Sequence, residues 1–123
     1  MLTPKNVDMH VHSNYSVDSV STMDDYCQFA LHNDIQVICF TEHVDNNKRD
    51  HGYNFFRPEA FFAEIAKTRE RYAGRVEVLA GLEFAEPHEY PDSLSSYRQM
   101  PFDFILGSEH YVHQYWNEAL LAQ

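Results

Sequence analysis

The residues best suited to chemistry in this chain are histidines and a glutamate that stand at the ends of short apolar segments. His10 and His12 lie in Val-Asp-Met-His-Val-His, His43 ends Phe-Thr-Glu-His, Glu83 ends Ala-Gly-Leu-Glu, and His110 ends Gly-Ser-Glu-His. Imidazole nitrogens and carboxylate oxygens are ligands that divalent transition metals accept in proteins. Four successive segments therefore end in a residue able to bind such a metal.

The first of these segments, residues 7–12, alternates polar and apolar side chains. Because side chains of a strand point to opposite faces in turn, we expect Asp8, His10 and His12 on one face and the apolar residues between them on the other. Two imidazoles on one face can chelate one metal or serve two adjacent ones, and Asp8 can orient a histidine. The alternative, a polar face on a half-exposed strand, does not suit a strand buried in a parallel sheet.

The carboxylates raise separate questions. Glu83 follows a buried run, where an unpaired carboxylate is costly, and bridging two metals would remove that cost. Gly81 indicates a close approach to the backbone. Asp18, in the loop after the first strand, fits a metal ligand, a helix cap or a solvated carboxylate, whereas Glu42 is suited to a structural role.

The remaining candidates are weaker. His88 and His113 lie in predicted loops near the mouth of the site, where they can contact substrate. His32 falls near the end of a predicted helix and is better explained by the helix dipole. Arg57 and Arg98 are possible anion contacts that nothing in the sequence singles out.

The elements that must position these residues alternate between strand and helix. We predict strands at 7–12, 35–41, 76–82 and 102–107, helices beginning at Ser21 or Thr22 and at Pro58, further helices at 93–100 and 115–122, and loops at 44–56 and 84–91. Alternation of this kind favours a parallel sheet or barrel with right-handed crossovers. In both architectures, functional groups gather at the C-terminal ends of the strands.

Composition limits the classes of function. The 123 residues suit one domain, and the excess of 19 acidic over 9 basic residues disfavours nucleic acid and anionic membranes as partners. Bound cations can still reverse the charge locally and attract an anionic substrate. No apolar run approaches the ~20 residues of a membrane span. Cys27 and Cys39 are expected to be small buried groups, which indicates a cytoplasmic protein.

Taken together, the motifs resemble the polymerase-and-histidinol-phosphatase (PHP) superfamily. The matching residues are His10-Val11-His12, Asp18, Thr41-Glu42-His43, Gly81-Leu82-Glu83 and Ser108-Glu109-His110. Residues 102–111, Phe-Asp-Phe-Ile-Leu-Gly-Ser-Glu-His-Tyr, look most like the histidinol-phosphatase branch. The resemblance extends from Asp8 to about Tyr111.

The resemblance implies an α/β fold, a partial (β/α) barrel of the distorted seven-stranded PHP type. About four βα units are expected over residues 1–123, with the C-terminal half of the barrel absent. It also implies two or three divalent metals, zinc, iron or manganese, with Glu83 and His110 next to the reaction. The implied ligands are His10, His12 and Glu83 for one metal, Glu83 and His110 for a second, and Asp18 and His43 for a third.

The function implied is a metal-dependent phosphomonoesterase of histidine biosynthesis. It would hydrolyse a small phosphate ester, histidinol phosphate above others, with a metal-activated water whose pKa is lowered to about 7. One alternative is an incomplete or non-catalytic metal-binding module of the same fold, able to self-associate through open sheet edges. Another is an amidohydrolase, which also begins with His-x-His, although no lysine here ends a predicted strand. The phosphatase interpretation requires the four strand-end imidazoles and the Glu83 carboxylate to converge.

Overall fold

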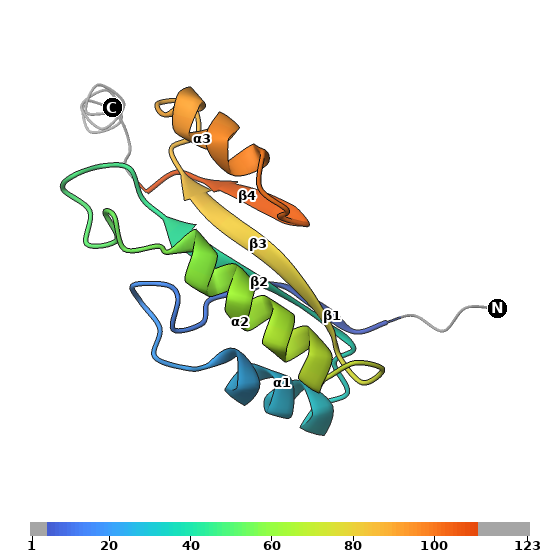
Figure 1. Cartoon of the computed structure of the whole chain (residues 1–123). Coiled ribbons are helices and arrows are strands. Elements are labelled where there is room, and N and C mark those ends of the chain that lie inside the picture. Colours follow the sequence, from blue (N-terminus) through green and yellow to red (C-terminus); the bar gives the residue numbers. More distant parts are fainter. Residues whose placement is uncertain (1–4, 111–123) are drawn as a thin grey trace, which may run out of the picture.

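A computed structural model describes residues 5–110 as one parallel sheet with a helix in each strand-to-strand connection (Figure 1). The elements in chain order are β1 (Val7–Val11), α1 (Met23–His32), β2 (Val37–Val44), α2 (Pro58–Arg71), β3 (Glu77–Ala85), α3 (Pro91–Arg98) and β4 (Phe104–Ser108). The strands follow the sequence order β1-β2-β3-β4. The predicted helix at 115–122 lies outside the described residues.

The helices pack on one face of the sheet and form a single core there. Strand residues of that face, such as Phe40, Leu82 and Phe84, are fully buried and cluster with Met23 of α1 and Phe61 of α2. Leu94 and Tyr97 of α3 pack against the same cluster. The alternate strand residues point to the opposite face, which is therefore the inner face of the curved sheet.

Local signals in the sequence set the helix ends. Thr22, one of the two predicted caps, forms a capping box with Asp25 at the start of α1. Pro58 occupies the first turn of α2, where its missing N–H costs nothing. Gly74 adopts a φ of 79° just beyond α2, in the left-handed region that favours glycine. None of the helices within residues 5–110 has the length and apolar character needed to cross a bilayer.

Two strands extend further than the polarity of the sequence predicts. β2 continues to Val44 and β3 to Ala85, so His43 and Glu83 lie within the ladder and face each other in register. The boundaries at 41 and 82 were wrong because polar side chains on the inner face do not interrupt backbone pairing. α3 similarly begins at Pro91, two residues earlier than predicted.

The predicted face of Asp8 is also wrong. The register pairs Asp8 with Ile38 but Val11 with Phe40, so β1 carries one extra residue between these points. This irregularity places Asp8 on the helix-covered face with Val11, while His10 and His12 remain on the inner face. The Asp8 carboxylate accepts a hydrogen bond from the backbone N–H of His10, at 3.2 Å, and not from an imidazole ring.

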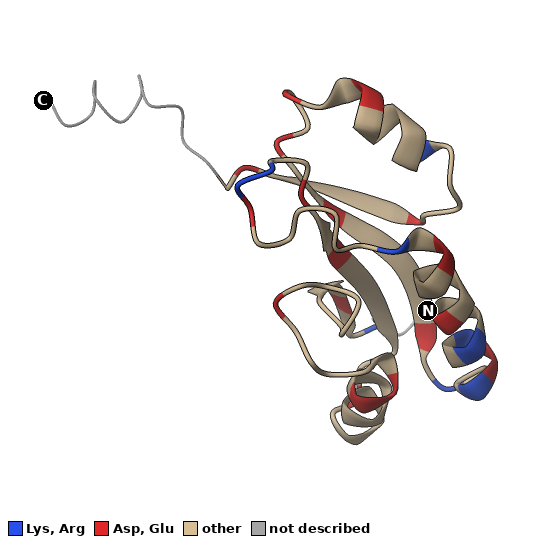
Figure 2. Ribbon diagram, turned by 60° about the vertical axis from the view of Figure 1, so that its left-hand side comes forward, with Lys and Arg blue, Asp and Glu red and all other residues tan. Residues whose placement is uncertain are grey.

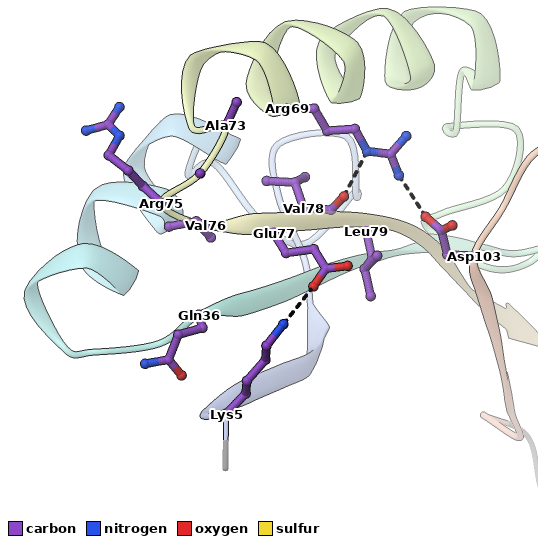
Figure 3. Close-up of a pocket in the computed structure, with 11 residues that line it drawn as sticks. Lys5, Gln36, Arg69, Ala73, Arg75, Val76, Glu77, Val78, Leu79 and Asp103 are labelled. Atoms are coloured by element: carbon purple, nitrogen blue, oxygen red, sulfur yellow. Dashed lines mark hydrogen bonds and ion pairs between the residues drawn. The ribbon is translucent and has the colours of Figure 1, made fainter. Parts of the chain in front are cut away.

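The strands begin at the opposite end of the molecule, where several basic side chains lie. Figure 2 shows Lys and Arg at the end of α2, whose last turn carries Arg69 and Arg71. A hollow of about 640 Å³ opens there (Figure 3), and four of its charged side chains form the ion pairs Lys5–Glu77, at 3.7 Å, and Arg69–Asp103, at 2.7 Å. This hollow is remote from the strand-end histidines.

Candidate metal centre

The C-terminal ends of the four strands bring the predicted ligands together. Three groups of side chains have ligand atoms within 4.8 Å of one another: His10, His12 and Glu83; His12, Asp18 and His43; His43, Glu83 and His110. The groups overlap, so the six residues form one continuous cluster. Its members come from β1, the loop after β1, β2, β3 and the residues just beyond β4.

Glu83 lies at the middle of the cluster, and its side chain is almost entirely buried. Its Oε1 atom lies 2.5 Å from His10 Nε2 and 3.3 Å from His12 Nε2. Its Oε2 atom lies 3.0 Å from His43 Nδ1 and 3.1 Å from His110 Nε2. Each carboxylate oxygen therefore faces its own pair of imidazoles.

Asp18 closes the other side of the cluster. Its Oδ2 atom lies 3.1 Å from His12 Nδ1 and 3.0 Å from His43 Nε2. Its side chain is about half exposed, and it reaches the imidazoles from a loop that is closed by a hydrogen bond from Asn14 N–H to the Ser21 carbonyl, at 2.7 Å. The structure thus places Asp18 against two histidines and not at a helix end.

Glu42 explains how that loop is held. It is fully buried, and its carboxylate accepts hydrogen bonds from the Ser13 backbone N–H, at 2.7 Å, from the Ser13 hydroxyl, and from the Ser16 hydroxyl, at 3.1 Å. The Ser16 hydroxyl in turn accepts from the backbone N–H of His43, at 2.8 Å. Burial raises the pKa of Glu42, and the three donors oppose that rise. Glu42 is therefore the structural carboxylate that anchors the Asp18 loop to β2.

The charges of the cluster are mutually dependent. Burial favours the neutral form of Glu83, yet the charge of His43 and the hydrogen bonds with His10 and His110 outweigh it and hold the pKa of Glu83 below its ordinary value. Burial likewise opposes a charge on His110, but the hydrogen bond to Glu83 and the charge of Asp45 raise its pKa above the ordinary value.

The donor set fits a metal. Within residues 5–110, Asp18, Glu83 and Asp45 form their ion pairs with histidines and none with Lys or Arg. His10 Nε2 and His12 Nε2 lie 3.3 Å apart, close to the ~3.3 Å that separates ligand atoms around a tetrahedral ion with bonds of about 2.0–2.1 Å. His43 Nδ1 is buried and lies 3.0 Å from Glu83 Oε2 without a hydrogen bond of good geometry to any described residue, as expected of a nitrogen meant for a metal.

The sequence did not predict two residues of the site. Asp45 lies just after β2, and its Oδ1 atom is 3.3 Å from His110 Nδ1. Glu86 accepts a hydrogen bond from the His110 backbone N–H, at 2.5 Å. Both fell in segments predicted to be loops. The period of two along β2 places Asp45 on the face of His43, so a longer strand would have predicted it, whereas no sequence signal indicated Glu86.

The weaker candidates lie elsewhere. His88 is exposed and pairs with Glu89 at 3.6 Å, outside the metal-binding groups of the described residues. His113 lies outside the described residues. Arg57 donates to backbone carbonyls of residues 54–56. His32 donates from Nδ1 to the Gln28 carbonyl in the last turn of α1, at 2.7 Å, as its helix-end position predicts.

Known proteins resemble this chain in both sequence and fold. It is 28% identical over 109 residues to the histidinol-phosphatase of Lactococcus lactis and 27% identical over 110 residues to a probable histidinol-phosphatase of Deinococcus radiodurans. These alignments cover 88% and 85% of this chain but 40% and 42% of the relatives, so the chain spans less than half of their length.

A solved structure agrees with these relatives. The crystal structure of the Lactococcus lactis histidinol phosphate phosphatase, complexed with zinc, L-histidinol and phosphate, superimposes with a TM-score of 0.77 at 26% sequence identity, covering 88% of this chain and 41% of that one. The four parallel strands and their helices are accordingly part of a PHP-type barrel. The PHP domain matches residues 8–122, nearly the whole sequence, and the chain belongs to the PHP domain family.

Proposed function

We propose that residues 1–123 belong to a PHP-like metal-dependent phosphoesterase domain that hydrolyses a small phosphate monoester. The observation that carries this proposal is the position of Glu83, whose two carboxylate oxygens each face a different pair of imidazoles. A carboxylate placed to bridge two histidine-rich sites can hold two metals close together, as two-metal hydrolysis requires. The alternative amidohydrolase interpretation is less well supported, because Lys5 precedes β1, Lys48 lies in the loop between β2 and α2, and Lys67 lies in α2, so none of the three lysines ends a strand.

The residues of the cluster would divide into ligand sets. His10, His12 and Glu83 would hold one divalent metal, and Glu83, His43 and His110 would hold another. Asp18 with His43, whose Nε2 atom lies 3.0 Å from Asp18 Oδ2, would hold a third, as the sequence resemblance implies. Zinc is the first candidate because the solved relative contains it, while iron and manganese suit the same ligands.

Bound metals would supply Lewis acidity and hydroxide at neutral pH. The chain's own residues would fix the geometry: Glu83 sets the spacing of the two sets, and His110 lies at the edge of the cluster, where it is partly exposed and able to contact a phosphate oxygen. The cluster alone has too little positive charge to bind a phosphate dianion, so the anion would need the cations. Histidinol phosphate is the proposed substrate, because the solved relative holds L-histidinol and phosphate.

The test is metal-dependent turnover by the purified chain. The protein is stripped with a chelator, reloaded with zinc, manganese or iron(II), and analysed for bound metal and for phosphate release from histidinol phosphate and p-nitrophenyl phosphate. We expect at least one metal per chain and turnover that the chelator abolishes. Metal binding without turnover would instead support a non-catalytic metal-binding module of this fold.

A pair of histidine variants makes the test specific. His10→Ala removes a ring that faces Glu83, whereas His32→Ala removes a ring from the far end of α1. His10→Ala is expected to lose bound metal and turnover together, and His32→Ala is expected to keep both. Equal loss in the two variants would refute the assignment of the cluster as the metal centre.

A further inference from the structure

The carboxylate of Asp45 is buried beside the histidine that ends the cluster. Asp45 is 6% exposed, its Oδ1 atom lies 3.3 Å from His110 Nδ1, and this oxygen makes no hydrogen bond of good geometry within the described residues. Gly52 makes room for it, because a Cβ atom at that position would lie 2.1 Å from Asp45 Oδ2. A buried carboxylate in such a confined place needs a partner.

The imidazole of His110 limits what that partner can be. A neutral imidazole has one nitrogen with a free lone pair and one that carries a hydrogen. The Nε2 atom of His110 faces Glu83 Oε2 at 3.1 Å, within the group that also contains His43. If Nε2 supplies the lone pair to a metal, Nδ1 must carry the hydrogen, and Nδ1 is the atom that faces Asp45.

We propose that Asp45 is a positioning residue for the metal centre. In the metal-loaded protein, Asp45 Oδ1, which lies 3.3 Å from His110 Nδ1, would accept a hydrogen bond from Nδ1–H; this bond would fix the tautomer that leaves Nε2 free for the metal and would orient the ring. Glu86 fixes the same residue from the other side by accepting from its backbone N–H. This inference rests on the proposed metal-dependent function and adds a residue to it that none of the sequence motifs contains.

A different arrangement of the same atoms is the competing explanation. Asp45, Asp50 and His110 also have ligand atoms within 4.8 Å of one another, so they could hold a metal of their own. That metal would take the lone pair of His110 Nδ1 and place the hydrogen on Nε2, facing Glu83. The two explanations thus predict opposite tautomers of one imidazole and different roles for Asp50.

The tautomer can be read from the wild-type chain. Long-range ¹H–¹⁵N correlation spectra of the zinc-loaded, ¹⁵N-histidine-labelled protein distinguish a protonated nitrogen from a metal-bound one, and His110 is assigned from the signal missing in His110→Gln. We expect a hydrogen on Nδ1 and zinc on Nε2. A hydrogen on Nε2 with zinc on Nδ1 would overturn the inference without any variant of Asp45.

Zinc affinity, measured by competition with a chromophoric chelator, supplies an independent readout. Asp45→Asn should weaken zinc binding roughly 10- to 100-fold, the range found for partners of metal-bound histidines, with the number of metals at saturation unchanged. Gly52→Ala, which would displace the carboxylate, should weaken it in the same direction. The matched control Asp50→Asn should leave zinc affinity within about twofold of wild type.

The outcomes separate this inference from the proposed function. Loss of one metal equivalent in both Asp45→Asn and Asp50→Asn would overturn it in favour of the separate metal site. Unchanged affinity in Asp45→Asn, with normal binding by wild type, would overturn it alone. Failure of the wild-type chain to bind zinc would overturn the proposed function and this inference together.

Discussion

Glu83 Oε2 lies 3.1 Å from His110 Nε2, so the end of β3 and the residues beyond β4 meet although the two side chains are 27 positions apart. The register pairs Glu83 with Leu106, and the chain after β4 brings His110 back over it. Glu86 supports this approach from a left-handed conformation, with a φ of 48°. The contact joins the buried centre of the cluster to its exposed edge.

Replacing the central carboxylate should disrupt both proposed metal sets at once. Glu83→Gln keeps the shape of the side chain but removes the charge that lies among four imidazoles. We expect a loss of bound metal, measured by elemental analysis, because an amide is a poor bridging ligand. Glu89→Gln, which changes an exposed glutamate six residues later, should retain the wild-type metal content.

The metal-free chain should have a stability optimum in mildly acidic solution. The raised pKa of His110 stabilises the fold below the ordinary value of 6.5, and this contribution is lost as the pH rises through the higher folded-state value. The lowered pKa of Glu83 acts oppositely: its contribution is present above 4.5 and is lost as the pH falls through the folded-state value. Thermal unfolding in chelator should therefore give its highest Tm at about pH 5–6.5.

Zinc should counteract the decline in Tm on the alkaline side of this optimum. A metal binds deprotonated imidazole, so the zinc-induced rise in Tm should grow from pH 6 to pH 8 while the metal-free Tm falls. His110→Gln should flatten the metal-free decline over the same range. A metal-free Tm that increases steadily from pH 6 to pH 8 would contradict the assigned charge of His110.

Much of the site was accessible from the sequence because parallel strands align their C-terminal ends. Apolar runs followed by His43, Glu83 and His110 were enough to predict that these side chains lie at one edge of the sheet. Their metal-binding role stays a prediction. The helix starts at Thr22 and Pro58 could also be predicted, since helix capping depends on a few neighbouring residues.

The parts that could not be predicted depend on pairing between distant segments. The extra residue in β1 that turns Asp8 to the helix face is visible only against the register of β2. Asp45 is buried because Gly52 gives it space and because His110, 65 positions further along the chain, faces it. The sequence predicted a regular strand at Asp8 and a loop at Asp45, whereas backbone pairing and burial determined the structure.

The stability of the Asp18 loop should depend on the charge of Glu42. In Glu42→Gln, the side-chain oxygen that remains can serve some of the Ser13 and Ser16 donors, but the new amide group brings another donor toward them. We expect a loss of about 2–3 kcal/mol in the free energy of unfolding, measured with urea in chelator, as for buried hydrogen bonds to a charged group. The exposed control Glu70→Gln should change it by less than about 0.5 kcal/mol.

Close packing at Gly81 should set the spacing of the strands that carry the site. A Cβ atom at Gly81 would lie 2.7 Å from Cys39 Sγ, 2.9 Å from Thr41 Cγ2 and 3.0 Å from the Phe104 carbonyl oxygen. The first two atoms belong to β2 and the third to β4, the strands on either side of β3, so the sheet has to widen to admit a methyl group. Gly81→Ala should therefore cost about 1–3 kcal/mol in the free energy of unfolding.

Glycine and cysteine variants separate this contact from a general effect of adding a methyl group to a strand. Gly107→Ala, whose Cβ would meet Pro87 Cγ at 3.4 Å and, apart from its chain neighbours, no other atom of residues 5–110 within 4 Å, should be nearly neutral in the same urea titration. Cys39→Ala removes the nearest atom, so the double variant Cys39→Ala/Gly81→Ala should be less destabilised than the sum of the single variants. Strict additivity would show that the strain arises elsewhere. If Gly81→Ala also weakens zinc binding, the spacing of β2 and β3 is part of what holds His43 against Glu83.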